Sequence, residues 1–305
     1  MFRRDLPLML AVAALMAIGF TFVKIAVPAL GAAVLVDVRV LAAAAVLASW
    51  TWARRRRLAF GRGVGPYLLL GTLNAALPFT LTAWGELRLD ASLAAILMAT
   101  IPLFTAALSA AVARERLGPS QRLGLLLGLV GVIVLSGWRP SGAGALDGPS
   151  ILAVLAAACS YAAGSVYTRH AFAGVDRTSL TIGNFAAAGV VLAPLALATP
   201  PAAAPSLTVI AAMAGLVVLS TAVSFRAYFV LIERSGPTVA TSIGFLIPVF
   251  GAAWGAILLH EAITWSMVIG GGIVLAAMHL VGGARPDTRI AGVNRWFRWR
   301  LAREG

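Results

Sequence analysis

The sequence predicts an all-α membrane protein with ten transmembrane helices, arranged as two inverted five-helix repeats (5+5). Three observations point to this fold class. Apolar residues make up 60% of the 305 residues and charged residues only 11%, whereas about a quarter of a soluble domain is charged. Apolar runs of bilayer-spanning length recur along the chain. One apolar stretch also occurs twice, 146 residues apart.

The spans follow from apolar runs of about 20 residues, which cross a hydrocarbon core of about 30 Å as helices because lipid offers no partner to free backbone groups. The ten predicted spans are 6–27, 32–53, 64–85, 91–113, 123–138, 149–167, 179–198, 207–232, 238–259 and 265–282.

The repeated stretch covers residues 91–116 and 237–261. The two copies share a proline at Pro102 and Pro248 and a closing glutamate at Glu115 and Glu261. This spacing is close to half the chain length and predicts duplication of one membrane unit. We therefore expect a first repeat at 1–139, a second repeat at 148–284 and a basic cytoplasmic tail at 285–305. The tail either lies on the anionic membrane surface or only enforces topology.

The arginines predict the orientation, because Lys and Arg are retained on the cytoplasmic side of short loops. With the N-terminus inside, 19 of the 24 basic residues lie in cytoplasmic segments. Ten crossings place both termini in the cytoplasm. Five spans per half is an odd number, so the second repeat begins on the opposite side and is inverted.

Several function classes have no support in the sequence. The net charge of +13 is spread between apolar runs as topology signals, so we expect no nucleic-acid partner. Cys159 is the single cysteine and no phosphate-binding Gly-rich motif occurs, so we expect no metal, no cofactor and no nucleotide site.

Charged residues within the spans are few, and each has two interpretations. Lys24, Asp37 and Arg39 either form an interfacial cluster that reaches the headgroups or an ion pair at an outer gate. Arg226 either extends toward the cytoplasm or faces a cavity as a positive charge for a substrate carboxylate.

The repeated prolines and glutamates also leave alternatives open. Glu115 and Glu261 either tie a loop to a neighbouring helix end or relay protons. Pro78, Pro102 and Pro248 lie within spans, where proline removes a hydrogen-bond donor and frees a carbonyl. Near the midplane such bends indicate a substrate site, although bends that serve only packing are the alternative.

A solute cavity at these bends would be lined by aromatic, methionine and small hydroxyl side chains, which suits a zwitterion with an apolar side chain. The expected substrate-binding residues are Phe20, Lys24, Asn74, Pro78, Thr80, Trp84, Met98, Thr100, Pro102, Tyr161, Ser165, Ser224, Arg226, Tyr228, Ser242, Phe245 and Pro248, with Asp37, Arg39, Glu115 and Glu261 as structural or gating residues.

Several motifs resemble the drug/metabolite transporter superfamily, specifically its EamA-type ten-helix exporters. The resembling elements are Gly19-Phe20-Thr21-Phe22-Val23-Lys24, Asp37-Val38-Arg39, and the segments 102–115 and 248–261, each followed by a glycine-rich span. Within the superfamily the chain is most similar to YddG-type exporters of aromatic and other neutral amino acids. The resemblance would imply export across the inner membrane of a bacterial cell.

We therefore expect a secondary exporter that works by alternating access, with a small-molecule substrate, the lipid bilayer as its environment and a monomer as the working hypothesis. Another substrate class within the superfamily is the first alternative. An intramembrane enzyme is a distant one, because the three histidines are scattered along the chain. The coupling remains open between uniport and proton antiport.

Overall fold

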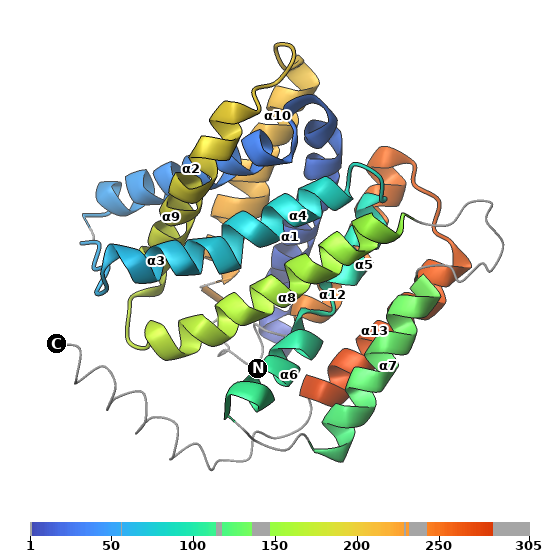
Figure 1. Cartoon of the computed structure of the whole chain (residues 1–305). Helices are drawn as coiled ribbons and strands as arrows, with labels where there is room; N and C mark the ends of the chain where they lie inside the picture. Colours follow the sequence, from blue (N-terminus) through green and yellow to red (C-terminus); the bar gives the residue numbers. More distant parts are fainter. Residues whose placement is uncertain are drawn as a thin grey trace.

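A computed structural model describes residues 2–55, 57–113, 118–135, 147–228, 230–231 and 243–282. These residues are all helical apart from short connections, and no strand occurs among them. Figure 1 shows the helices packed in one body, with the short connections at their ends. The tail at 285–305, together with Glu115 and Ser242, lies outside the described residues.

The helices follow the predicted spans closely. The first ones in chain order are α1 (Phe2–Leu30), α2 (Ala32–Ala53), α3 (Val64–Gly71), the π-helix η1 (Thr72–Ala76), α4 (Leu77–Gly85), α5 (Ala91–Met98), α6 (Ile101–Ala113) and α7 (Pro119–Leu135). The later ones are α8 (Gly148–Ala171), α9 (Arg177–Ala198), α10 (Leu207–Gly215), the π-helix η2 (Leu216–Val223), α12 (Ile243–Leu259) and α13 (Trp265–Gly282).

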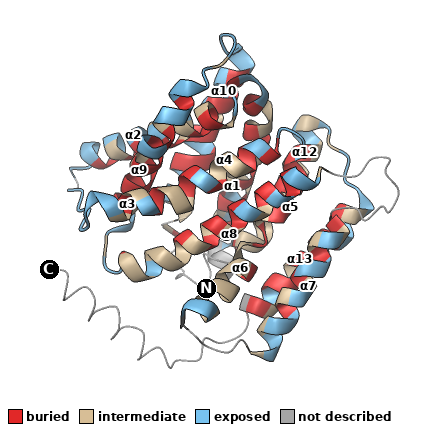
Figure 2. Ribbon diagram, in the orientation of Figure 1, coloured by how far each residue is buried: buried red, intermediate tan, exposed pale blue. Residues whose placement is uncertain are grey.

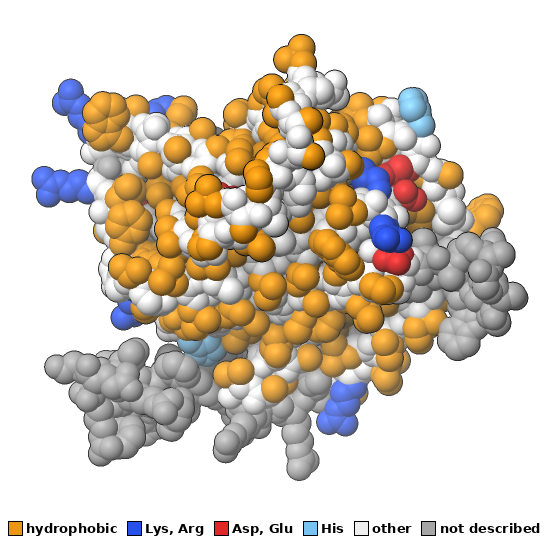
Figure 3. Space-filling model, turned by 45° about the horizontal axis from the view of Figure 1, so that its top comes forward, with side chains coloured by type: hydrophobic (Ala, Val, Ile, Leu, Met, Phe, Trp, Pro, Cys, Tyr) orange, Lys and Arg blue, Asp and Glu red, His pale blue; other side chains and the backbone are white. Residues whose placement is uncertain are grey.

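Within this part of the chain, seven apolar helical segments are long enough to cross a membrane, and each coincides with a predicted span. Three shorter apolar helices, Pro119–Leu135, Ile243–Leu259 and Trp265–Val281, lie at three further predicted spans. Large apolar side chains such as Trp52, Leu197 and Leu207 are more than four-fifths exposed. Figure 3 shows apolar side chains over most of one face, with charged ones gathered at a few places. Such a surface suits contact with lipid.

Proline and hydroxyl side chains account for the irregular parts of two spans. Pro78 cannot donate to the carbonyl four residues earlier, and the wider turn of η1 directly precedes it. In η2 the Thr221 hydroxyl donates to the carbonyl of Leu216, five residues back, at 2.8 Å. Such side-chain bonds compete with the regular helical ladder.

The structure places the prolines differently from the simple bends expected. The predicted span at 91–113 is broken at residues 99–100. Pro102 therefore lies in the first turn of α6, where its missing N–H costs nothing, and not within a continuous bent helix. Pro78 lies within the continuous helical segment Val64–Gly85, at the start of α4 and close behind η1. Pro248 lies inside α12.

Glycines allow α7 and α13 to lie side by side at one edge of the molecule (Figure 1). A Cβ atom on Gly131 would lie 3.1 Å from the Gly270 carbonyl, and one on Gly270 would lie 3.0 Å from the Gly131 carbonyl. Small residues at such a crossing let backbones make close van der Waals contact in lipid.

The largest buried cluster joins α1, α2, α4, α9 and α10. Figure 2 shows buried residues concentrated where these helices face one another. Phe185 on α9 is the largest fully buried apolar side chain there. This packing fixes α9 against α2 and against the span formed by α3, η1 and α4.

Candidate substrate cavity

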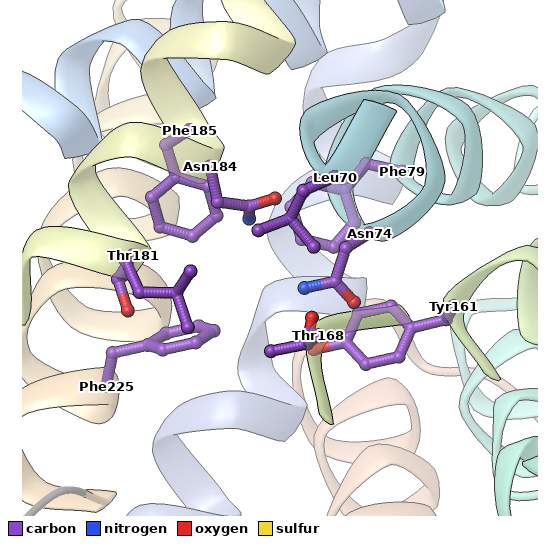
Figure 4. A pocket seen from close by; sticks show the side chains of 10 residues that line it. Leu70, Asn74, Phe79, Tyr161, Thr168, Thr181, Asn184, Phe185 and Phe225 are labelled. Atoms are coloured by element: carbon purple, nitrogen blue, oxygen red, sulfur yellow. The ribbon is translucent and has the colours of Figure 1, made fainter. Parts of the chain in front are cut away.

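A small cavity of about 60 Å³ lies among helices from both halves of the chain. By its volume it holds a few water molecules in this conformation. The lining residues are Leu70, Asn74, Phe79, Tyr161, Thr168, Leu180, Thr181, Asn184, Phe185 and Phe225 (Figure 4). They come from α3, η1, α4, α8 and α9, and Phe225 follows shortly after η2.

Two asparagines dominate the polar part of the lining. Figure 4 shows the Asn184 side chain entering from α9 and the Asn74 side chain extending toward Thr168 and Tyr161. The Oδ1 atoms of both are buried and have no hydrogen-bond partner among the described residues. A buried polar group without a partner costs about 1–3 kcal/mol. These two amide oxygens can therefore accept hydrogen bonds from a solute in the cavity.

Three phenylalanines form the apolar part of the lining. The rings of Phe185 and Phe225 meet edge to face with centroids 5.6 Å apart, and those of Phe79 and Phe185 lie 6.5 Å apart. Edge-to-face pairs of this kind fix ring orientation as well as burying apolar area. The cavity thus combines amide and hydroxyl groups with a preformed aromatic wall.

Arg39 brings a positive charge next to this wall. Its guanidinium lies 4.2 Å from the centre of the Phe79 ring, and its Nε donates to the Thr221 hydroxyl at 3.3 Å. An arginine over an aromatic face is stabilised by the ring's electron density. Arg39 is held inside the helix bundle, between α2, α4 and η2.

Lys24 of α1 bonds to the turn that follows α4. Its ammonium donates to the backbone carbonyls of Glu86 and Leu89, both at 2.7 Å. Both carbonyls lie in the turn between α4 and α5. In the described part of the chain, neither Lys24 nor Arg39 forms an ion pair, and Asp37 has a buried, unpartnered oxygen. No ion pair therefore joins these three residues in the described structure.

Glu261 ties the start of α5 to the end of α12. Its carboxylate accepts hydrogen bonds from the Ala91 amide at 2.7 Å and from the Ser92 amide at 3.0 Å, and the Ser92 hydroxyl donates to it as well. The residue at the ordinary capping position, Asp90, makes no such bond. This geometry corresponds to the helix-tying interpretation of Glu261.

Comparison with known proteins identifies the family. The EamA-like transporter family matches residues 5–137 and, separately, residues 148–283. These two matches cover most of the chain. The chain belongs to the EamA-like transporter family. It is a membrane transporter, a multi-pass protein of the bacterial inner membrane.

Relatives of this EamA-like chain are named as transporters. The "Uncharacterized inner membrane transporter YedA" of Escherichia coli (strain K12) is 30% identical over 295 residues, which cover 92% of each chain. The "Probable amino-acid metabolite efflux pump" of Salmonella typhimurium is 26% identical over 67% of this chain and 72% of its own length. "Protein PecM" of Dickeya dadantii is 24% identical over 70% and 72%.

A solved crystal structure also has this fold. It superposes with a TM-score of 0.63 and covers 90% of this chain and 94% of its own, at 20% sequence identity. At this identity the likeness concerns the fold alone.

Among the residues expected to bind substrate, Asn74 and Tyr161 line the cavity of this EamA-like transporter. Several of the others are hydrogen-bonded to other groups of the protein. The hydroxyls of Thr100, Ser165 and Ser224 donate to backbone carbonyls three or four residues earlier, and the Met98 sulfur accepts from Thr82.

The remaining expected residues lie away from the lining. Trp84 and Arg226 are exposed, and Pro78 and Pro248 are buried. Partly buried positions outside the lining are Phe20, Lys24, Thr80, Pro102, Tyr228 and Phe245. Arg39 contacts the cavity residue Phe79.

The face of α9 that lines the cavity was not predicted from the sequence. Thr181, Asn184 and Phe185 all come from this helix. One signal was available, because Asn74 and Asn184 are the two asparagines that occur inside apolar runs. An uncharged amide within a span is costly and indicates a functional site.

Proposed function

We propose that this transporter exports neutral and aromatic amino acids and related metabolites by alternating access through the cavity between Asn74 and Asn184. The unpartnered amide oxygens of these two residues carry the proposal, since they can accept hydrogen bonds that the described part of the protein leaves unused. Phe79, Phe185 and Phe225 add an apolar surface for a side chain of the solute. Binding sites of small molecules combine such elements.

The charge near the cavity favours a zwitterionic solute. Arg39 lies behind the Phe79 ring at 4.2 Å and attracts a carboxylate at the polar end of a ligand. A relative named as a probable amino-acid metabolite efflux pump agrees with this substrate class. An exporter of another metabolite or drug class in the same superfamily is the second candidate.

The transport cycle requires two halves that exchange conformations, and we infer an inverted repeat of residues 1–139 and 148–284 with both termini in the cytoplasm. The family matches the chain twice with nearly these bounds. The π-helices Thr72–Ala76 and Leu216–Val223 overlap when shifted by 146 residues. Arg39 and Phe79, which are in contact, correspond under the same shift of 146 residues to Phe185 and Phe225. These two residues are in contact as well.

Reciprocal packing between the proposed halves supports the same symmetry. A Cβ on Gly19 of α1 would meet Ser220 of η2, and a Cβ on Gly164 of α8 would meet Asn74 of η1. The first helix of each proposed half thus packs on the π-helix of the other. Inverted halves of this kind rock about a central site in secondary transporters.

Proteoliposomes loaded with purified full-length protein test the proposal. The measurement is counterflow of labelled leucine and phenylalanine. Sugars and dicarboxylates are tested as competitors at equal concentration. We expect neutral amino acids to exchange and Asn184→Leu, which keeps the volume but removes the amide, to lower exchange at least tenfold. Thr199→Val, at an exposed turn after α9, is the matched control and should leave exchange unchanged. Exchange of sugars or dicarboxylates instead would favour the second candidate.

A further inference from the structure

Glu86 is a buried acid without a partner in the described structure. It follows the last residue of α4 in the turn that leads to α5, and 0% of its surface is exposed. Neither carboxyl oxygen has a hydrogen-bond partner among the described residues. Buried acidic side chains are almost always paired, so Glu86 requires a physical explanation.

The charged groups that face Glu86 are each bonded elsewhere. Lys24 of α1 donates to the backbone carbonyls of Glu86 and Leu89 and not to the Glu86 carboxyl. Arg39 of α2 bonds Thr221 and lies over Phe79. Glu261, which follows α12, bonds the start of α5 and adds a second negative charge.

These surroundings favour the neutral form of the acid. An ionised carboxylate in an apolar environment without compensating bonds takes up a proton instead of bearing the full desolvation cost. Burial is the largest influence and raises the pKa of Glu86 well above its usual range. The charge of Glu261 raises this pKa further, whereas Lys24 and Arg39 lower it.

We propose that Glu86 is a proton-binding site that couples opening of the turn between α4 and α5 to proton release. In the closed form the carboxyl keeps its O–H bond. When the turn opens, water reaches the group, the O–H bond breaks and the proton passes to water. The turn closes again when a proton from water restores the neutral acid. This proposal rests on the proposed transport cycle, in which the turn lies on the outer side of the membrane.

The sign of the pH effect follows from linkage. The closed form binds the proton more tightly than the open form, so acid favours closure and higher pH favours opening. Between the two pKa values, the ratio of open to closed protein rises about tenfold per pH unit for one released proton. Acid on the outer side therefore favours the closed turn. Export requires the proton to leave Glu86, so that the outer end can open.

Infrared titration of the full-length protein in liposomes tests the protonation directly. We expect the carbonyl band of a neutral carboxylic acid at pH 7 in the wild type and in Asp90→Asn, and its loss in Glu86→Gln. Asp90 is the control because it lies in the same turn but is exposed. A wild-type spectrum without this band at pH 7 would overturn the proposal, whatever the variants do.

Labelling of an introduced cysteine tests the coupling. In a Cys159→Ala background, Ala91→Cys places a thiol at a fully buried position beside the turn, and Arg88→Cys provides an exposed reference. The labelling rate of Ala91→Cys, divided by that of the reference, should rise up to tenfold per pH unit. With Glu86→Gln added, the ratio should be flat, and an unchanged slope refutes the coupling. Neither readout depends on transport, so a failure of amino-acid exchange would leave both results interpretable.

Discussion

The carboxylate of Glu261 accepts hydrogen bonds from both the amide and the hydroxyl of Ser92, 169 residues away in the chain. Glu261 also accepts from the Ala91 amide, so one side chain from beyond α12 satisfies the first free N–H groups of α5. An anion at a helix N-terminus is favoured by the free amides and by the helix dipole. This contact joins the start of α5 in the first predicted repeat to the segment that follows α12 in the second.

Glu261→Gln should therefore destabilise the protein. Replacing the carboxylate by an amide removes a charge-assisted cap, and we expect a loss of about 2 kcal/mol in unfolding free energy. Thermal unfolding of the protein in detergent measures this as a lower Tm. Asp90→Asn is the control, since Asp90 makes no side-chain cap despite its position. Equal losses for the two variants would show that general charge, and not the bond to Ser92, stabilises α5.

Gly71→Ala should disturb the wall of the cavity. A Cβ at this position would lie 2.6 Å from the Ala188 nitrogen and 2.9 Å from the Asn184 carbonyl oxygen, both of which are rigid backbone atoms of α9. We expect a cost of about 2 kcal/mol for the forced separation of α3 from α9, together with weaker solute binding because Asn184 moves. Unfolding and counterflow measure the two effects.

The neighbouring Gly65 provides the control for Gly71. Its Cβ would have no neighbour within 4 Å, so Gly65→Ala should be neutral or stabilising by about 0.5 kcal/mol. A Gly71 variant with normal stability and normal exchange would mean that α3 and α9 separate without cost.

The two arginines within the spans should differ in their effect on transport. Arg39→Gln removes the guanidinium beside Phe79, and we expect the KM for neutral amino acids to rise about tenfold, equivalent to about 1.4 kcal/mol. Amino-acid amides, which lack the carboxylate, should be affected much less. Arg226 is exposed, so Arg226→Gln should leave both KM values within about twofold. The opposite ranking would assign the carboxylate site to Arg226.

The positions of the spans could be predicted from the sequence because lipid imposes a simple rule. Runs of about 20 apolar residues must be helical in a bilayer, and the helices lie where the runs are. The interior of each span was harder to predict. The π-helix before Pro78 and the break before Pro102 depend on how backbone groups are satisfied locally, which hydropathy does not report.

The site was predicted only in part because its chemistry depends on tertiary contacts. Asn74 and Tyr161 were expected from their polarity within spans, and the same signal at Asn184 was passed over. Glu86 gave no signal in the sequence, since a glutamate two residues from Arg88 resembles an ordinary surface turn. Its burial arises from α1 and the end of α12, which are far away in the chain.

The glycines that pack on the two π-helices should respond unequally to alanine. In Gly164→Ala the new Cβ would lie 2.9 Å from the Asn74 Cβ and 3.1 Å from its backbone nitrogen, which cannot move without shifting η1. In Gly19→Ala the nearest atom is the Ser220 hydroxyl, which rotates away at the loss of its bond to the Met16 carbonyl. We expect Gly164→Ala to cost about 2 kcal/mol or more and Gly19→Ala about 1 kcal/mol.

Combining Gly19→Ala with Ser220→Ala should restore most of the lost stability, measured as Tm, because it removes the clashing oxygen. A double variant less stable than Gly19→Ala alone would show that the Ser220 hydroxyl bond, and not the close approach of α1 to η2, holds this crossing.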